Sequence, residues 1–233
     1  MPHKFSILTA LVALLSPMAH ADVLLSQTPN RLAYFGISDT GTTGRAIENF
    51  TLSTGEYINR VSWQGWYSNG LSNRMLPNPT AADSFTINFY GDVSVDPNNP
   101  FSPPGALMAS INVGGADRTV FPGWTSVNDY WADLGSNITL GSGRFWISIV
   151  NDTIGTANAD WNWFADGPTF QSSPYLINGG FSNDSGATYG FGDFTFALTL
   201  EGGTRHVPEP SPLALLALSG LGLILARRRF GKA

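Results

Sequence analysis

The sequence predicts an all-β protein whose body is a single antiparallel β-sandwich. Apolar residues alternate with polar ones in several short runs, and turn-forming residues separate these runs. No stretch of twelve residues in the middle of the chain has a helical period. Many short strands with polar outer faces favour a jelly roll. The 233 residues include no cysteine, so the core must stabilise this fold without disulfides.

The clearest strand signal comes from residues 84–89, where Phe85, Ile87 and Phe89 share one face. Similar alternation occurs in residues 107–113, 145–149 and 194–200, and weaker strand candidates are residues 32–37, 58–63, 118–121 and 138–140. Turn-rich segments separate them, at residues 77–79, 96–100, 114–115 and 141–143.

The first 21 residues have the pattern of a secretory signal peptide, which predicts an N-terminal signal helix. A basic start, an apolar run and the small-x-small pair Ala19 and Ala21 follow one another in the required order. We expect signal peptidase to cut after Ala21, which makes Asp22 the new N-terminus. The alternative is an uncleaved membrane anchor, but the apolar run is well short of the roughly 20 residues that a spanning helix needs.

The C-terminal segment at residues 213–226 is apolar apart from one serine and two glycines. It predicts a short transmembrane helix, which at ~1.5 Å per residue reaches ~21 Å, less than a hydrocarbon core of ~30 Å. Arg227, Arg228 and Arg229 begin a basic tail at residues 227–233 that stays cytoplasmic and holds the rest of the chain outside. The segment is therefore expected to be a weak anchor in the inner membrane.

A proline-rich linker at residues 204–212 precedes this helix and contains Val207, Pro208, Glu209 and Pro210. Alternating prolines forbid a helix and favour an extended chain, the form that a protease binds. The order of this motif, a short apolar helix and an arginine cluster resembles the PEP-CTERM sorting signal of exopolysaccharide-producing Gram-negative bacteria. The resemblance implies that exosortase, a membrane protease, cuts near the motif and that the domain is released or transferred to the outer surface. A plain anchor that is never cut is the alternative.

The remaining residues, 22–203, are expected to form one β-sandwich domain. Between Asp22 and Val207 the chain has seven arginines, no lysine and sixteen carboxylates, a formal net charge of −9. This charge argues against binding to nucleic acid or to anionic lipid. Residues 61–67, 83–90 and 145–149 are similar to a β-sandwich module of secreted bacterial proteins, which in outline is similar to carbohydrate-binding domains. That resemblance implies the fold.

The residue types in the domain exclude most catalytic mechanisms. His3, His20 and His206 lie in the removable ends, and without cysteine or lysine the domain has no base for a serine nucleophile, no catalytic thiol and no usual zinc site. The common mechanism that these residue types still allow is glycoside hydrolysis by a pair of carboxylates. The candidate residues are Glu48, Glu56 and Glu201 together with the aspartates. No motif surrounds these glutamates, so ordinary surface charge is favoured and we expect no enzyme activity.

Trp161 and Trp163 are the candidate carbohydrate-binding residues, together with Asp160. Two residues apart on an extended segment, both indoles point the same way, and their small and polar neighbours indicate a loop or strand end near the surface. Exposed indoles beside polar groups can stack on sugar rings. The alternative, which the sequence favours, is that both pack inward. Trp63 and Trp66 cannot share a strand face, and Gly65 indicates a bulge between them.

Two loops rich in oxygen ligands are candidate calcium sites. No other cofactor is expected. They contain Asp92, Asp96 and Asn99 in one case and Asn151, Asp152 and Asp160 in the other. No spacing matches a known calcium loop, so solvated turns are the favoured interpretation.

Together these features predict an exported cell-surface or extracellular-matrix protein. We expect a non-catalytic binding or structural module associated with exopolysaccharide, as in a biofilm, that is processed by signal peptidase and an exosortase-type protease. The alternatives are a carboxylate-based glycan-active enzyme and a purely structural surface protein without a ligand.

Overall fold

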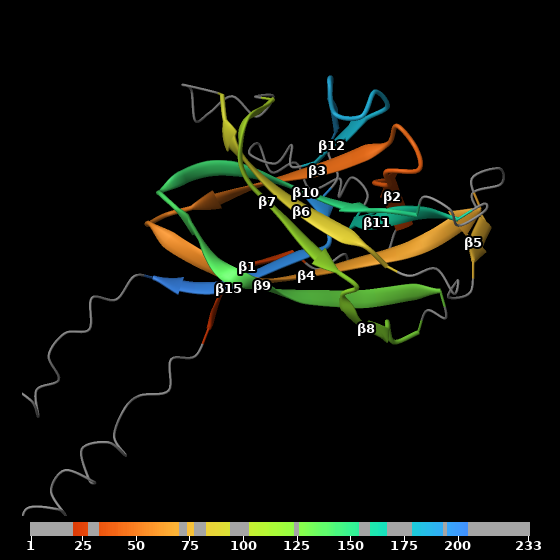
Figure 1. Ribbon diagram of the computed structural model, residues 1–233, viewed down its shortest axis with the longest axis horizontal. Coiled ribbons are helices and arrows are strands. Elements are labelled where there is room, and N and C mark those ends of the chain that lie inside the picture. Colours follow the sequence, from red (N-terminus) through yellow and green to blue (C-terminus); the bar gives the residue numbers. More distant parts are fainter. Residues whose placement is uncertain are drawn as a thin grey trace, which may run out of the picture. The chain divides into compact units, whose positions relative to one another are not determined.

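The computed structural model of the protein describes most of the chain between residues 21 and 204. The described ranges are 21–27, 33–69, 74–76, 83–93, 103–123, 126–153, 159–166, 179–192 and 195–204. The chain divides into two compact units, Met1–Gly203 and Thr204–Ala233. In the described ranges every regular element is a strand, and the strands form two antiparallel sheets that enclose one core (Figure 1). The predicted all-β sandwich is therefore confirmed, whereas its jelly-roll topology stays a prediction.

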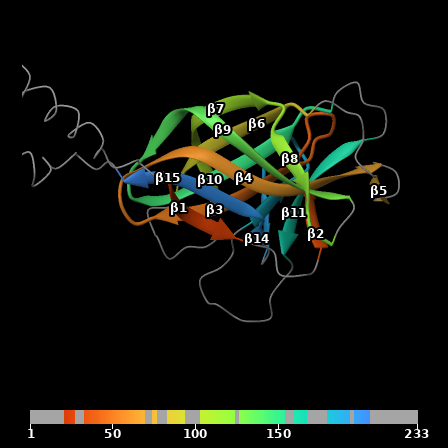
Figure 2. The ribbon, with the colours of Figure 1, turned by 90° about the horizontal axis from the view of Figure 1, so that it is seen from below.

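The larger sheet, here sheet A, is organised around the long strand β4. Its strands are β1 (Asp22–Gln27), β2 (Ala33–Ile37), β4 (Glu56–Asn69), β5 (Arg74–Leu76), β8 (Asp117–Val120), β9 (Val127–Leu140), β11 (Asp160–Asp166), β14 (Thr195–Phe196) and β15 (Leu198–Thr204). Strand β4 pairs with β9, β11, β15 and β5 along its length. In Figure 2, seen from below, β15, β4 and β9 run side by side.

The smaller sheet, sheet B, is the second layer. Its strands follow the order β13 (Gly190–Gly192), β12 (Gly179–Ser182), β3 (Arg45–Leu52), β10 (Gly143–Asn151), β6 (Phe85–Asp92) and β7 (Pro104–Gly114). The strand predicted at residues 84–89 is β6, with Phe85, Ile87 and Phe89 fully buried as the alternation predicts. The predicted strand at residues 107–113 is the edge strand β7, where Leu107 is more than half exposed.

Aromatic side chains from both sheets meet in the core. The ring of Phe85 in sheet B lies 5.1 Å from the rings of Trp63 and Trp161 in sheet A, in edge-to-face geometry. Trp63 in turn stacks on Tyr130 at 5.7 Å with nearly parallel planes. Such pairs each add about 0.5–1.5 kcal/mol beyond the free energy of burying their area. This cluster compensates for the lack of disulfides.

One predicted strand is split in two. The run at residues 194–200 forms β14 and β15, and Ala197 lies between them. The N–H of Ala197 donates to the carbonyl of Phe164, and its carbonyl accepts from the indole N–H of Trp163, both at 2.9 Å. Because both backbone groups of Ala197 bind β11, the regular ladder is interrupted there.

Strand β1 lies at the edge of sheet A and pairs with β15, with Asp22 opposite Gly202. A side chain at Gly202 would place its Cβ 1.8 Å from the carbonyl oxygen of Tyr57, so only glycine lets β15 approach β4. Among the described residues there is no helix with the length and apolar character to cross a membrane. The predicted signal helix, most of the linker at 204–212, the transmembrane helix at 213–226 and the tail at 227–233 lie outside the described residues.

Candidate functional site

The outer face of sheet A carries a row of polar side chains on β4. Core residues Val61 and Trp63 point toward sheet B, so the residues that alternate with them point outward. These outward residues are Arg60, Ser62 and Gln64.

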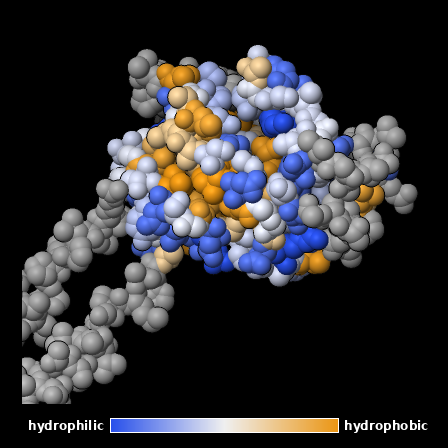
Figure 3. All heavy atoms as spheres, viewed as in Figure 1, coloured by the Kyte–Doolittle hydropathy of each residue, from blue (hydrophilic) through white to orange (hydrophobic). Residues whose placement is uncertain are grey.

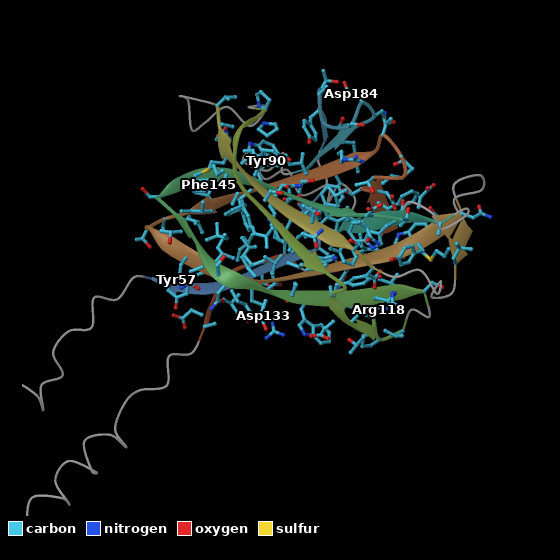
Figure 4. The ribbon with its side chains drawn as sticks, viewed as in Figure 1. Tyr57, Tyr90, Arg118, Asp133, Phe145 and Asp184 are labelled. Atoms are coloured by element: carbon cyan, nitrogen blue, oxygen red, sulfur yellow. The ribbon has the colours of Figure 1, made fainter. Side chains whose placement is uncertain are left out.

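Strand β9 contributes a second outward row beside the first. Tyr130 and Ala132 are buried in the core, and Asp129, Trp131 and Asp133 alternate with them. Asp133, labelled in Figure 4, is on the side of sheet A that faces away from sheet B.

The strand register brings the two rows together in pairs. Gln64 lies opposite Asp129, Ser62 opposite Trp131, and Arg60 opposite Asp133. On the other side of β9, strand β8 places Thr119 opposite Asp129 and Asp117 opposite Trp131. Directly opposed residues on one face have Cβ atoms about 4.5–5.5 Å apart. The indole of Trp131 is thus surrounded by polar side chains of three strands.

Arg60, Ser62, Gln64, Thr119, Asp129 and Trp131 line a groove with a volume of about 410 Å³, together with Thr199 of β15. Small-molecule sites typically occupy ~300–1,000 Å³. The groove is therefore large enough to hold a short segment of a ligand on the sheet surface.

Hydrogen-bonding groups in the groove are only partly used. The side-chain amide of Gln64 donates to Oδ1 of Asp129 at 2.7 Å, whereas Oε1 of Gln64 has no partner among the described residues. Nε of Arg60 lies 3.8 Å from Oδ1 of Asp133, and both side chains are more than a third exposed. A ligand with hydroxyl groups could donate to the carboxylate of Asp129, whereas Oε1 of Gln64 is buried.

Trp131 is distinguished from the other tryptophans by its exposure. Of the seven tryptophans in the chain, six are in the described ranges, and five of those are almost completely buried, at Trp63, Trp66, Trp146, Trp161 and Trp163. Trp131 alone among the six is partly exposed, and it lines the groove. Sequence reasoning missed it, although the alternation of Asp129, Trp131 and Asp133 around buried Tyr130 is a signal that could have found it.

The predicted sugar platform of Trp161 and Trp163 is wrong. Both residues are fully buried, because β11 lies inside sheet A between β4 and β2 and both indoles face the core. Trp163 stacks on Phe196 at 4.7 Å. The third member, Asp160, is half-buried at the start of β11, and burial raises the pKa of its carboxyl, with a smaller contribution from Asp39. The inward packing that the sequence favoured is the one observed.

Trp63 and Trp66 lie on opposite faces of β4, as their spacing predicts, but both are buried. Trp66 belongs to a second apolar cluster on the outer side of sheet A, where it meets the ring of Phe35 at 5.0 Å. The bulge predicted at Gly65 is not there, because the register of β4 against β9 shifts between Ile58 and Arg60 instead. Glycine at position 65 instead allows β4 to pack closely against Trp161 of β11, because a Cβ at this position would lie 2.5 Å from the ring of Trp161.

The three glutamates proposed for a hydrolase do not converge. Glu48 is fully buried in the core, where the backbone N–H of Phe196 donates to it at 2.9 Å. Glu56 lies two residues before the core residue Ile58 and is therefore on the inner face of sheet A. Glu201 directly follows the core residue Leu200 and is therefore on the outer face.

The residues expected in calcium loops bind other protein groups. Asp92 forms an ion pair with Arg144, and Asp152 accepts a hydrogen bond of 2.7 Å from Thr40. Asn151 donates to the hydroxyl of Tyr67 at 2.7 Å and lies at the opposite end of the β6–β10 pair from Asp92. Asp96 and Asn99 lie outside the described residues. Within the described ranges no three acidic or histidine side chains are grouped so that they could hold a metal ion.

The fold and the groove define an all-β, two-sheet protein with a polar and aromatic groove on one outer face. Residues 206–229 match the family described as the PEP-CTERM protein-sorting motif. The resemblance of the C-terminal segment to this signal is thereby confirmed. The matched residues include the Val-Pro-Glu-Pro segment at 207–210 and the arginines at 227–229. The motif indicates export, transient anchoring in the membrane, processing by exosortase and sorting to the surface.

A larger part of the chain is similar to a solved structure, the crystal structure of the cysteine protease and lectin-like domains of Cwp84, a surface layer associated protein of Clostridium difficile. The two share 11% identity with a TM-score of 0.43, and the match covers 70% of this chain and 32% of that one. This chain therefore spans only a minor part of the length of that protein. No curated protein matches the chain.

Proposed function

We propose that this protein is a non-catalytic binding module of the extracellular polysaccharide layer, which its sorting signal delivers to the cell surface or the matrix. The observation that carries the proposal is the partly exposed indole of Trp131 in a polar groove on the outer face of sheet A. A sugar ring offers an apolar face of C–H groups and an edge of hydroxyls. The groove offers an aromatic ring and, around it, amide, hydroxyl and carboxylate groups that complement both.

The form of the groove supports a chain ligand over a compact one. Its polar residues follow β4 and β9, and the two strands remain paired from Arg60 opposite Asp133 to Gln64 opposite Asp129. Four residues along a strand span ~13 Å at 3.3 Å per residue. That length suits more than one sugar unit of an extended polysaccharide.

The placement of the three candidate glutamates supports a non-catalytic role. A glycoside hydrolase needs two carboxyl groups that face one cleft at ~5–10 Å. Glu48 is enclosed in the core, and Glu56 and Glu201 face opposite sides of their sheet. We expect incubation with the host's polysaccharide to release no new reducing ends. Release of reducing ends by the pure protein would favour the alternative of a glycan-active enzyme.

A second candidate, a structural surface protein without a ligand, is favoured by the exposed apolar residues of β7. Leu107 and Met108 are 55% and 52% exposed on an edge strand of sheet B. Figure 3 shows apolar side chains gathered at the surface on this side of the protein. Exposed edge strands with apolar side chains can pair with other chains.

The two candidates can be separated by affinity electrophoresis in gels that contain the host's own polysaccharide. We expect the protein to be retarded, Trp131→Ala to lose at least tenfold in affinity, and Leu107→Ala to bind like the unchanged protein. Equal binding by Trp131→Ala would contradict the groove as the site. If instead no variant binds and Leu107→Ala prevents self-association, the structural candidate is correct.

The sorting step is tested separately by intact-mass analysis of the protein from supernatant and membranes of its host. We expect a supernatant species that begins at Asp22 and ends near Pro208 to Pro210. Replacement of Arg227, Arg228 and Arg229 by glutamine should reduce the amount of this species. A membrane-bound form that retains the arginines as the main product would identify an uncut anchor.

A further inference from the structure

We infer that the groove is selective for uncharged polysaccharide segments and rejects chains that carry carboxylate or sulfate groups. The inference rests on the proposed binding function and adds the class of ligand. It comes from the placement of charge around Trp131, which the strand register determines.

Three carboxylates surround the partly exposed indole of Trp131. Asp117 lies directly opposite Trp131 on β8, while Asp129 and Asp133 lie two residues before and after it on the same face of β9. Opposed residues have Cβ atoms about 4.5–5.5 Å apart, and residues two apart on a strand are separated by ~6.6 Å at 3.3 Å per residue. A sugar that stacks on Trp131 therefore lies within one Debye length of all three, which is about 8 Å at 0.15 M salt.

Among the described residues that line the groove, Arg60 is the only cation, and it already has an acidic neighbour. Its Nε lies 3.8 Å from Oδ1 of Asp133. Arg118 also belongs to β8, but its side chain points to the inner face of sheet A. There its Nη1 lies 3.0 Å from Oδ2 of Asp83. The carboxylate of Asp129 has a neutral partner, Gln64. Of the three aspartates only Asp129 lines the groove, and together with Arg60 the three give the surface around Trp131 a net charge of −2.

This arrangement distinguishes sugar hydroxyls from acidic sugar substituents. A hydroxyl can donate a charge-assisted hydrogen bond to the carboxylate of Asp129. A uronate or sulfate ester has no proton to donate and brings a negative charge toward Asp117 and Asp129, so repulsion and loss of hydration both disfavour it. Selectivity thus arises from a repulsive element beside the attractive one.

The experiment compares two pairs of polymers that share a backbone and differ in charge. The full-length protein, purified in mild detergent, is run in affinity gels that contain hydroxyethyl cellulose or carboxymethyl cellulose, and fully methyl-esterified polygalacturonate or the free acid. We expect the charged member of each pair to bind at least tenfold more weakly at 50 mM salt. Salt screens the repulsion, so at 500 mM the difference should shrink because binding to the charged polymer improves.

A charge-neutralising variant supplies the matched test. Asp117→Asn combined with Asp129→Asn removes the repulsion, and asparagine at 129 can still accept the hydrogen bond from Gln64. The double variant should bind the charged polymers within threefold of the neutral ones, whereas Asp152→Asn, directly after β10 of sheet B, should keep the full discrimination. Circular dichroism checks that each variant is folded.

The outcomes separate the inference from the function on which it rests. Equal or tighter binding of the charged member by the unchanged protein overturns the selectivity and leaves the binding function intact. Discrimination that persists in the double variant also overturns it, because the carboxylates would not be its cause. If neither these polymers nor the host's own polysaccharide retards the protein, the binding function fails, and the inferred selectivity fails with it.

Discussion

The backbone N–H of Phe196 in sheet A donates a hydrogen bond of 2.9 Å to Oε2 of Glu48 in sheet B, and so connects the two layers through the core. Glu48 shares the inward face of β3 with Ala46 and Phe50 and has no exposed surface. Burial raises the pKa of this carboxyl well above 4.5, although the bonds from Phe196 and Gln27 act in the opposite direction. The core therefore tolerates the protonated acid better than the carboxylate.

This relationship predicts a stability that falls as pH rises. A carboxyl with a raised pKa in the folded state stabilises the fold fully below its unfolded pKa and loses that contribution as pH rises through the folded value. Glu48→Gln keeps an acceptor for Phe196 but cannot ionise. We expect the free energy of unfolding of the variant to equal that of the unchanged protein near pH 4. Toward pH 8 it should become larger, by about 1.4 kcal/mol for each pH unit between the unfolded and the folded pKa. Urea unfolding at several pH values measures this, and a constant difference would contradict it.

Two matched substitutions of tryptophan test where the indoles lie. Trp161→Phe shortens a side chain that packs on Phe85 in the core, and we expect the free energy of unfolding to fall by about 1–3 kcal/mol. Trp131→Phe changes a partly exposed outer side chain, and the loss should stay within about 0.5 kcal/mol. Thermal unfolding of both variants gives the comparison. Equal losses would show that Trp131 also packs as a core residue.

Gly65→Ala is predicted to destabilise the sandwich through overpacking. The new Cβ would lie 2.5 Å from the ring of Trp161 and 2.8 Å from the carbonyl oxygen of Asn162, neither of which can move without disturbing β11. Overpacking of this kind typically costs about 1–3 kcal/mol. Gly141→Ala is the control, because a Cβ at Gly141 meets nothing within 4 Å. A Gly65→Ala variant as stable as the control would show that β11 is loosely packed.

Two arginines offer a direct contrast between an enclosed and an exposed ion pair. Arg118 lies 3.0 Å from Asp83, whose side chain is 7% exposed and also accepts a hydrogen bond from the hydroxyl of Tyr67. Burial raises the pKa of Asp83, and the bonds from Tyr67 and Arg118 partly offset that rise. Arg118→Gln should cost about 3 kcal/mol, because it leaves a buried carboxylate without its cation.

The matched variant Arg60→Gln breaks the exposed pair with Asp133 and should cost under about 1 kcal/mol. Chemical denaturation of both variants at one pH measures the two losses in the free energy of unfolding. If the two losses were equal, the Asp83 pair would be as well solvated as the surface pair.

Alternation in the sequence was sufficient to predict β6, which buries one face, but of β9 it predicted only residues 138–140. Residues 84–89 alternate because the intervening Thr86, Asn88 and Tyr90 are only half-buried, so their polar groups can still reach water. Strand β3 was missed because both of its faces are covered. Ile47 is as fully buried as Ala46 beside it, and the period of two disappears from its sequence. For the same reason the sequence of β11 left a surface position open as an alternative to the inward packing that it favoured, since polar Asn162 is buried between the two core tryptophans.

The groove could not have been predicted from any single segment. Its polar residues come from strands that are far apart in the sequence, and only the pairing of β9 with β4 and β8 places Gln64, Asp129 and Thr119 in one row. In contrast, the sorting motif is continuous along the chain, so its residue order alone was sufficient.

The pairing of β1 with β15 has a mechanical consequence. Asp22 lies opposite Gly202, so the beginning of the first strand and the end of the last lie at the same end of one antiparallel pair. Tension between these two ends would load the backbone hydrogen bonds one after another, beginning at Asp22, instead of all at once. The edge strand should therefore peel away at low force, while the paired β4 and β9 stay closed over the aromatic core. Under shear at a cell surface, the first strand would give way before the rest of the sandwich.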